Sequence, residues 1–155
     1  MIAPSDGSSL KYARLWLINQ ANGKGAKCPC CHQFTKVYWR SINSGMARSL
    51  IAIYRKYGLE FGYIPALSAK SREEGKFVYW GMLEEAIQPR PDGGRAGYWR
   101  VTDKGEDFIL RGLRVPKHAL VYDGEFIRWA DEKDLVNIRD CLKKHFDLDV
   151  LLGRI

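Results

Sequence analysis

Apolar residues recur at helical spacing in two segments of the first third of the chain. Residues 8–21 carry Leu, Ala and Ile in a partly periodic pattern, with a serine before them and an Asn-Gly pair after them. Residues 43–57 show a clearer helical period, and a glycine follows as a C-terminal stop. The pattern predicts two helices, separated by a loop, a cysteine cluster and a short strand over 34–38.

Shorter elements are expected in the middle of the chain. A Ser-x-x-Glu capping box opens a short helix predicted over 72–80, whereas residues 59–69 show no regular period. Strands predicted over 82–87 and 98–101 flank a loop rich in proline, glycine and arginine, which is typical of a hairpin. Thr102 is placed to cap the helix that follows.

The last third of the chain predicts a second hairpin and a final helix. Apolar segments over 119–122 and 125–129 flank Asp123-Gly124, a strong signal for a two-residue turn. Residues 134–145 place apolar side chains on one helical stripe. Helices and hairpins following one another in this way predict the α+β class.

Charge changes this picture because the basic excess is confined to one region. The net charge is +7, and residues 7–59 contain nine Lys and Arg but no Asp or Glu. A confined basic region is what a polyanion-binding surface requires, since phosphate contacts and counterion release provide affinity for any sequence. The alternative is a solvated basic face without a partner.

Composition predicts a folded protein that has no membrane contact. The hydrophobic fraction of 46% is sufficient for a core. No run approaches the roughly 18 apolar residues of a membrane span, and the N-terminus lacks a basic region followed by an apolar run. We therefore expect a cytoplasmic location.

The middle of the chain resembles the winged-helix regulators of the MarR type. Residues 80–85, Trp-Gly-Met-Leu-Glu-Glu, are similar to the end of the recognition helix in that family. Residues 98–105, Tyr-Trp-Arg-Val-Thr-Asp-Lys-Gly, with Phe108 after them, are similar to the returning wing and its Thr-x-x-Gly turn. The resemblance covers residues 42–112. The whole chain also resembles small uncharacterised phage or prophage proteins that join a Cys-x-x-Cys element to such a domain, which implies the host cytoplasm as its location.

The resemblance and the pattern together predict three consecutive segments. Residues 1–41 form an N-terminal helix and a basic, cysteine-rich element. Residues 42–115 form the winged helix-turn-helix. Residues 116–155 form a C-terminal hairpin and helix that pack on the same core. A homodimer built through this last segment is compatible with the resemblance.

Basic residues in three groups are candidates for nucleic-acid contact: the helix over 43–57 with the residues before it, the predicted recognition helix, and the predicted wing. Acidic neighbours in the recognition helix leave a mixed-charge surface as its alternative, and the wing can also be an ordinary solubilising hairpin. Arginines on such a loop can follow the DNA backbone or enter a narrow minor groove. The predicted contacts are Lys36, Arg40, Arg48, Arg55, Lys56, Lys70, Arg72, Lys76, Arg90, Arg95 and Arg100.

The cysteines suggest a structural zinc site. Cys28 and Cys31 have the Cys-x-x-Cys spacing that supplies half of such a site. Cys141 and His145, four residues apart on a predicted helix, are the candidates for the second half, and His32 and Cys30 are substitutes. The alternative is a turn of reduced thiols, with Cys141 a buried apolar residue.

Catalysis has little support, so we expect a protein that is not an enzyme. The three histidines lie in no nucleophile or metal-hydrolase motif, and phosphate-binding loops are absent from the sequence. The predicted function is binding of double-stranded DNA, as a phage-type regulator of transcription or replication. The main alternative is a protein–protein interaction module that modulates a host complex on the same scaffold, using aromatics such as Tyr38 and Trp39. RNA binding by the cysteine element is a third interpretation.

Overall fold

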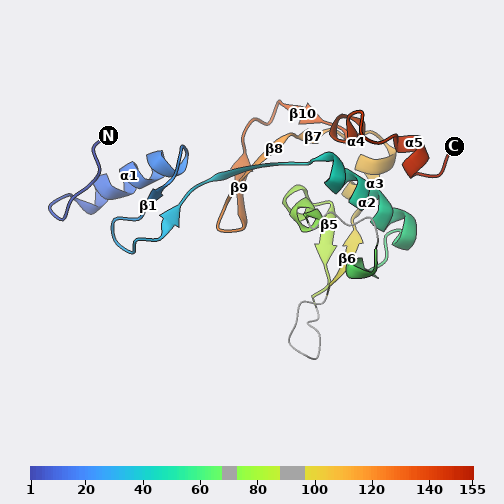
Figure 1. The fold of residues 1–155 in the computed structure, drawn as a ribbon, viewed down its shortest axis with the longest axis horizontal. Coiled ribbons are helices and arrows are strands. Elements are labelled where there is room, and N and C mark those ends of the chain that lie inside the picture. The colour runs from blue at the N-terminus through green and yellow to red at the C-terminus, as the bar shows by residue number, and fades with distance from the viewer. Residues whose placement is uncertain (68–72, 88–96) are drawn as a thin grey trace. The chain divides into compact units, whose positions relative to one another are not determined.

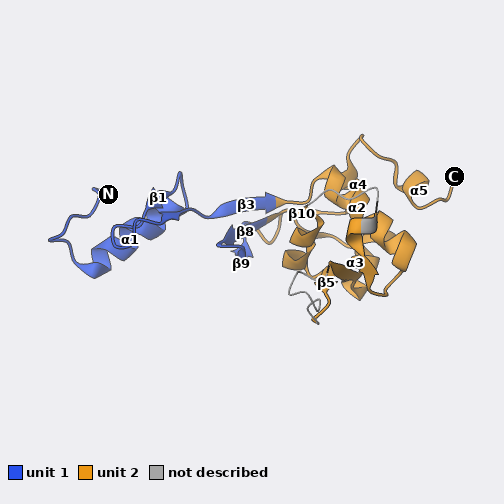
Figure 2. Cartoon of the chain, turned by 60° about the horizontal axis from the view of Figure 1, so that its bottom comes forward, with its two compact units in different colours: residues 1–40, 119–130 blue, residues 41–118, 131–155 orange. Residues whose placement is uncertain are grey.

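The computed structural model describes residues 1–67, 73–87 and 97–155 (Figure 1). The chain is a mixed α/β structure with small antiparallel sheets, which agrees with the expected α+β class. It divides into two compact units (Figure 2): unit 1 contains residues 1–40 and 119–130, and unit 2 contains residues 41–118 and 131–155. The predicted division into three consecutive segments stays a prediction.

Unit 1 begins with helix α1 (Leu10–Ala21), whose N-cap is Ser9, as the sequence predicts. The serine Oγ accepts a hydrogen bond from the backbone N–H of Tyr12 at 3.1 Å. Strands β1 (Ala26–Lys27) and β2 (Phe34–Thr35) then form an antiparallel hairpin with the cysteines at its tip. The predicted strand over 34–38 is thus shorter, and the strand β3 (Tyr38–Ser41) follows it.

The second sheet has the strand order β3-β8-β9, with β8 (His118–Tyr122) and β9 (Glu125–Trp129) forming the predicted hairpin. Asp123 and Gly124 have φ values of 51° and 76°. A two-residue turn with both φ values positive has the hand that matches the twist of paired strands, and Asp-Gly tolerates it. The prediction from Asp123-Gly124 is confirmed.

Unit 2 begins with helix α2 (Ser44–Tyr57), which starts and stops where the sequence predicts. Its N-cap is Asn43, whose Oδ1 accepts from the Met46 N–H at 2.8 Å, and Gly58 ends it. The short strand β4 (Gly62–Tyr63) and the 3₁₀ turn η1 (Ile64–Ala66) follow in the segment that shows no period in the sequence.

The helix predicted over 72–80 is a 3₁₀ helix, η2 (Glu74–Trp80), and Gly81 ends it in the left-handed region at φ 71°. With three residues per turn, positions 74, 77 and 80 fall on one edge, and Glu74, Phe77 and Trp80 are all buried. Val78, next to Phe77, lies off this edge and is 47% exposed.

A three-stranded sheet with the order β4-β6-β5 lies beside η2. The strand β6 (Tyr98–Val101) pairs antiparallel with β5 (Leu83–Glu85) on one side and with β4 on the other. Helix α3 (Asp103–Leu110) follows directly, with Thr102 as its N-cap, as predicted.

The C-terminal part of unit 2 differs from the prediction of one helix over 134–145. Residues 135–136 form the strand β10 (Leu135–Val136), paired with β7 (Val115–Pro116). Asn137 and Asp140 form a capping box that starts helix α4 (Ile138–Leu142) only after the strand. Lys143 at φ 57° ends that helix, and α5 (Leu148–Leu151) is a separate turn.

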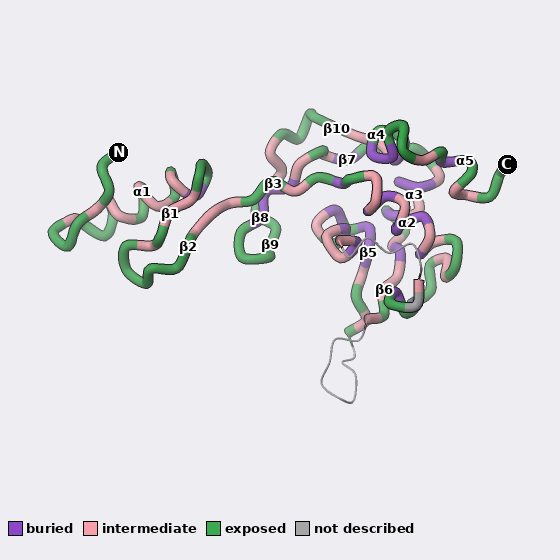
Figure 3. The backbone as a smooth tube through the Cα atoms, viewed as in Figure 1, coloured by how far each residue is buried: buried purple, intermediate pink, exposed green. Residues whose placement is uncertain are grey.

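The apolar core lies mainly in unit 2 (Figure 3). Met46, Leu50 and Ile53 of α2 are buried together with Phe77 and Trp80 of η2, and α2 contacts both η2 and β6. The Trp80 Nε1–H donates to the carbonyl oxygen of Pro116 at 2.8 Å, which satisfies the polar atom of a buried indole. In the described part of the chain, no helix has the length and hydrophobicity that a bilayer crossing requires.

Candidate functional site

The Thr-x-x-Gly step ties α3 to the end of η2. Thr102 Oγ1 donates to the Gly81 carbonyl at 2.5 Å and accepts from the Gly105 N–H at 3.2 Å. Gly105 lies so close to the chain that a Cβ there would stand 2.5 Å from the Met82 carbonyl oxygen. Thr102 and Gly105 therefore have a structural role, because both hold the start of α3 against the residues that follow η2.

Lys76, a predicted contact on η2, is held by an acidic neighbour. Its Nζ lies 2.8 Å from Glu73 Oε1, and the other oxygen of Glu73 accepts from Asn43 Nδ2 at 2.7 Å. Glu73 thus joins the start of η2 to the N-cap of α2. The pair leaves little net charge at this position.

Arg100 on β6 is paired in the same way. It lies opposite Glu84 in the antiparallel register, and its Nε and Nη2 lie 2.9 and 2.8 Å from Glu84 Oε2. The guanidinium also stacks over the ring of Phe61, with 4.8 Å from Cζ to the centroid. Arg100 is therefore oriented by a carboxylate and a ring, which reduces its availability to phosphate.

The three cations of α2 gather around one cavity. Arg48, Arg55 and Lys56 line a space of about 410 Å³ together with Val150 and Leu151. Arg55 Nη1 donates to the Leu151 carbonyl at 2.9 Å. The ion pairs found among the described residues involve other cations, so the positive charge of this cluster is not neutralised locally.

Arg48 is the most constrained member of this α2 cluster. Its guanidinium stacks on the ring of Phe146, with 4.9 Å from Cζ to the centroid. Its Nε is buried and has no hydrogen-bond partner in the part of the chain that the structure describes. No local pattern in the sequence identifies Phe146 as a partner, because the two residues are far apart along the chain.

Lys36 and Arg40 lie in unit 1, where they flank Tyr38. The Lys36 Nζ and the Arg40 Cζ lie 5.4 and 4.9 Å from the centroid of the Tyr38 ring. Trp39 beside it is 61% exposed. Cations interleaved with exposed aromatic rings are a pattern suited to nucleic-acid bases as well as to protein surfaces.

Four predicted contacts, Lys70, Arg72, Arg90 and Arg95, lie outside the described residues. The capping box expected from Ser71 also begins there. The described N-cap of η2 is Glu73, whose side chain makes no capping hydrogen bond.

The cysteine cluster forms the turn of the β1–β2 hairpin. The Cys28 N–H donates to the Gln33 carbonyl at 2.8 Å, and the His32 N–H donates to the Cys28 carbonyl at 2.9 Å. His32 has a φ of 64°, which lets the chain turn back into β2. The backbone N–H groups of Cys31 and Cys30 donate to the Cys28 sulfur and lower the pKa of that thiol.

The residues expected to complete a zinc site are arranged differently from the prediction. Helix α4 ends at Leu142, so Cys141 and His145 do not share one helix face. Cys141 is 4% exposed in the core of unit 2, and burial raises the pKa of its thiol to about 12. It has the environment of an apolar core residue, whereas Cys30 and Cys31 are exposed and Cys28 is half-buried. Zinc binding by this chain stays a prediction.

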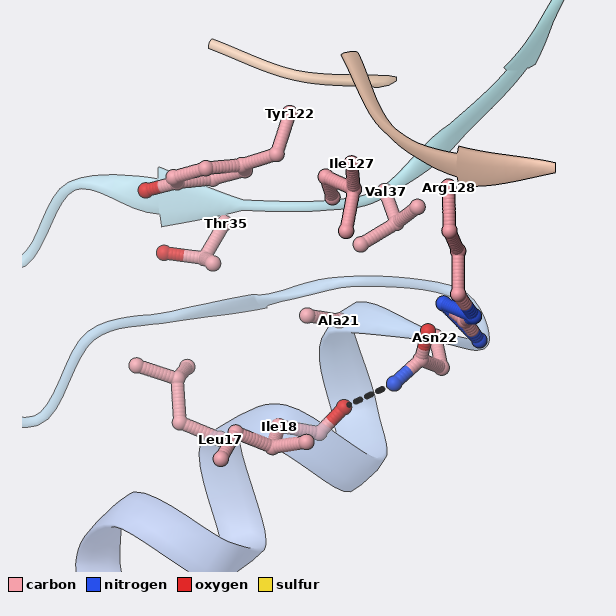
Figure 4. Close-up of a pocket in the computed structure, with 9 residues that line it drawn as sticks. All are labelled: Leu17, Ile18, Ala21, Asn22, Thr35, Val37, Tyr122, Ile127 and Arg128. Atoms are coloured by element: carbon pink, nitrogen blue, oxygen red, sulfur yellow. Dashed lines mark hydrogen bonds between the residues drawn. The ribbon is translucent and has the colours of Figure 1, made fainter. Parts of the chain in front are cut away.

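Unit 1 also contains an apolar cavity of about 390 Å³ (Figure 4). Leu17, Ile18 and Ala21 of α1 line one side of it, and Tyr122 and Ile127 of the β8–β9 hairpin line another. The sequence pattern does not reveal this cavity, because its walls come from segments that are distant along the chain.

No protein-family model, curated protein or solved structure matches the chain. Within the described residues, no three His, Cys, Asp or Glu side chains form a group arranged to hold a metal ion.

Proposed function

We propose that unit 2 is a winged helix that binds double-stranded DNA and that the chain acts as a regulator of transcription or replication. The observation that carries the proposal is the sheet with the strand order β4-β6-β5. Along the chain, α2 precedes this sheet and η2 leads into its strand β5. The strand β4, which precedes the proposed recognition segment η2, pairs with β6, the second strand of the β5–β6 hairpin. In this proposal the β5–β6 hairpin corresponds to the wing. The proposed role is binding and not catalysis.

The ion pairs of Lys76 and Arg100 indicate which cations are available to bind phosphate. Both are occupied by Glu73 and Glu84, so they position the scaffold and contribute little to DNA affinity. Phosphate contact then depends on the wing arginines Arg90 and Arg95 and on cations outside these pairs. Such contacts fix the register of the protein on DNA and carry little sequence information.

The experiment is a fluorescence-anisotropy titration of a random-sequence duplex at several salt concentrations. We expect micromolar binding at low salt that weakens steeply as salt rises. The double variant R90A/R95A should reduce the magnitude of the log K against log salt slope by about 2, roughly one for each phosphate that is no longer neutralised.

The matched control is K133A/K144A, which removes the same charge from two exposed positions of unit 2. It should leave the slope nearly unchanged. Equal losses in the two variants would mean that net charge alone drives binding and would reject the wing. Absence of binding even at low salt would reject DNA affinity altogether.

A second function, a protein–protein interaction module, is favoured by the surface of unit 1. Trp39, Ile18 and Leu10 are 61%, 60% and 57% exposed there. Large exposed apolar side chains on a unit with so small a core support an interaction surface there. Binding of a protein partner through them would persist at salt concentrations that release DNA.

A further inference from the structure

The β1–β2 turn has the cysteine spacing of a metal-binding half-site. Cys28 and Cys31 stand three residues apart, and the turn between them is closed by the His32 N–H to the Cys28 carbonyl. The Cys28 N–H also donates to the Gln33 carbonyl at 2.8 Å, which joins the two ends of the turn.

The β1–β2 hairpin fixes the position of this turn. Gly25 at φ 85° directly precedes β1, and a Cβ there would stand 2.6 Å from the ring of Phe34. The two strands pair in the register Ala26 with Thr35 and Lys27 with Phe34. The cysteines therefore lie on a short, closed hairpin and not on a free loop.

A tetrahedral zinc site needs four ligands, and a Cys-x-x-Cys turn supplies two. Cys141 does not supply a third, because it is packed among the core residues of unit 2 at 4% exposure. A two-fold axis through the metal would bring the same two thiols from a second copy of the chain, which completes a set of four thiolates without any further residue.

The rest of unit 1 also favours a second copy of the chain as the source of the other two thiols. All of its residues are described, and its buried apolar side chains are only Ala21, Ala119, Leu120 and Val121. A unit of this size with so small a core is generally stabilised by a metal, a disulfide or association. Phe34, next to the turn, is 53% exposed, and Leu15 on α1 is 52% exposed. These side chains offer apolar surface to a neighbouring copy.

We propose that Cys28 and Cys31 from two copies of this chain bind one zinc ion, so that the hairpin turn of unit 1 joins a metal-bridged homodimer. Each thiol loses its proton to solvent as the metal binds, and no oxidant or reductant takes part. The dimer contact belongs to unit 1 and does not depend on whether unit 2 binds DNA.

The test uses the full chain, purified under reducing conditions, loaded with zinc chloride and freed of excess metal. Zinc is measured by atomic emission and mass by sedimentation equilibrium, both without DNA. We expect about one zinc per two chains and a dimer that dissociates when EDTA is added. Reducing conditions and EDTA reversal separate this dimer from a disulfide-linked one.

Three variants locate the ligands. C28S/C31S should bind no zinc and remain monomeric. C30S changes the same turn without removing a proposed ligand, so it should keep both zinc and dimer. H145A, at an exposed position of unit 2, should also keep both, because His145 is not a ligand under this proposal.

Cobalt substitution of the unaltered chain gives a readout that does not depend on any variant folding. The sulfur-to-cobalt charge-transfer absorption should have the intensity of four thiolates in a tetrahedral site. One zinc per monomeric chain, loss of zinc in H145A, absence of zinc uptake, or a dimer that survives EDTA would each overturn the proposal.

Discussion

Units 1 and 2 contain similar kinds of residues but bury them to very different extents. Phe77, Trp80 and Phe108 of unit 2 are at most 1% exposed, and they pack around α2 and the three-stranded sheet. In unit 1 the largest buried side chain is Leu120, and rings such as Trp39 remain at the surface. Apolar content alone does not make a core, because a small unit with few layers cannot enclose large side chains.

The two units therefore also differ in what stabilises them. Unit 2 has an interior that can stabilise it without help, since buried apolar area is the main favourable term in folding. Unit 1 consists of one helix and two small sheets, so its own core contributes less to its stability. We therefore expect substitutions to act globally in unit 2 and locally in unit 1.

The largest expected effect follows truncation of Phe77, which is fully buried on η2. Phe77→Ala should lower the free energy of unfolding by about 3–5 kcal/mol, because it removes a ring and leaves a cavity. Val78→Ala, at the next position of the same helix but 47% exposed, should change it by less than about 1 kcal/mol. Urea denaturation followed by Trp fluorescence measures both. Similar losses in the two variants would contradict the one-edge packing of the 3₁₀ helix.

An intermediate effect is expected from Gly105→Ala in unit 2. The added Cβ would meet the Met82 carbonyl oxygen at 2.5 Å and Val101 Cγ1 at 2.7 Å. Since backbone must move to admit it, the loss in unfolding free energy should be about 1–3 kcal/mol. Lys104→Ala, exposed on the same helix, is the control and should be nearly neutral. A stable G105A variant would show that the Thr-x-x-Gly step has no packing role.

A smaller and local effect is expected from Gly25→Ala in unit 1. The positive φ and the close Phe34 ring make alanine unfavourable by about 1–2 kcal/mol. Hydrogen exchange should become faster in the β1–β2 hairpin but stay unchanged in α2. Gly7→Ala, where a Cβ meets nothing within 4 Å, is the control. Faster exchange in both units would show that they unfold together, so that the contrast in their stability would not hold.

The smallest expected effect concerns a part-buried hydrogen bond of unit 2. Tyr54 donates to Glu106 Oε2 at 2.8 Å, and Tyr54→Phe should cost about 1 kcal/mol at neutral pH. The bond to Glu106 raises the Tyr54 pKa above its ordinary value of 10.0. The unfolded tyrosine ionises first as pH rises through 10, so the contribution of Tyr54 to stability falls in that range. The gap between the two proteins in urea denaturation should therefore narrow at pH values above that ordinary pKa. A gap that widens there would contradict the assigned donor.

Features encoded by neighbouring residues could be predicted from the sequence. The caps Ser9, Asn43 and Thr102 and the turn Asp123-Gly124 each satisfy backbone groups within three residues, so their signals are local. The two-residue strand β4 could not be predicted, because its only reason to be extended is its pairing with Tyr98 and Trp99. The strand β10 lies where the apolar pattern predicts the start of a helix, and the reason is the same, since its partner is the distant β7.

The features of the candidate sites likewise divide into those encoded by neighbouring residues and those that depend on distant ones. The cysteine turn could be predicted from its spacing, because a turn is a local structure. The neutralisation of Arg100 could not, since it depends on a register that sets Glu84 opposite it across the hairpin. The stacking of Arg48 on Phe146 likewise depends on how α2 meets the C-terminal residues. Charge counts along a sequence therefore overstate the cations that are available to a ligand.

Unit 1 is assembled from two stretches of chain, residues 1–40 and 119–130, that leave the ribosome at different times. Proteins are synthesised from the N-terminus, and segments that have emerged can fold only with what is already present. The first forty residues cannot complete unit 1 until the β8–β9 hairpin has been made, because that hairpin supplies Leu120 and Val121 to its small core. A fragment that stops before residue 119 would therefore lack the pairing partner of β3.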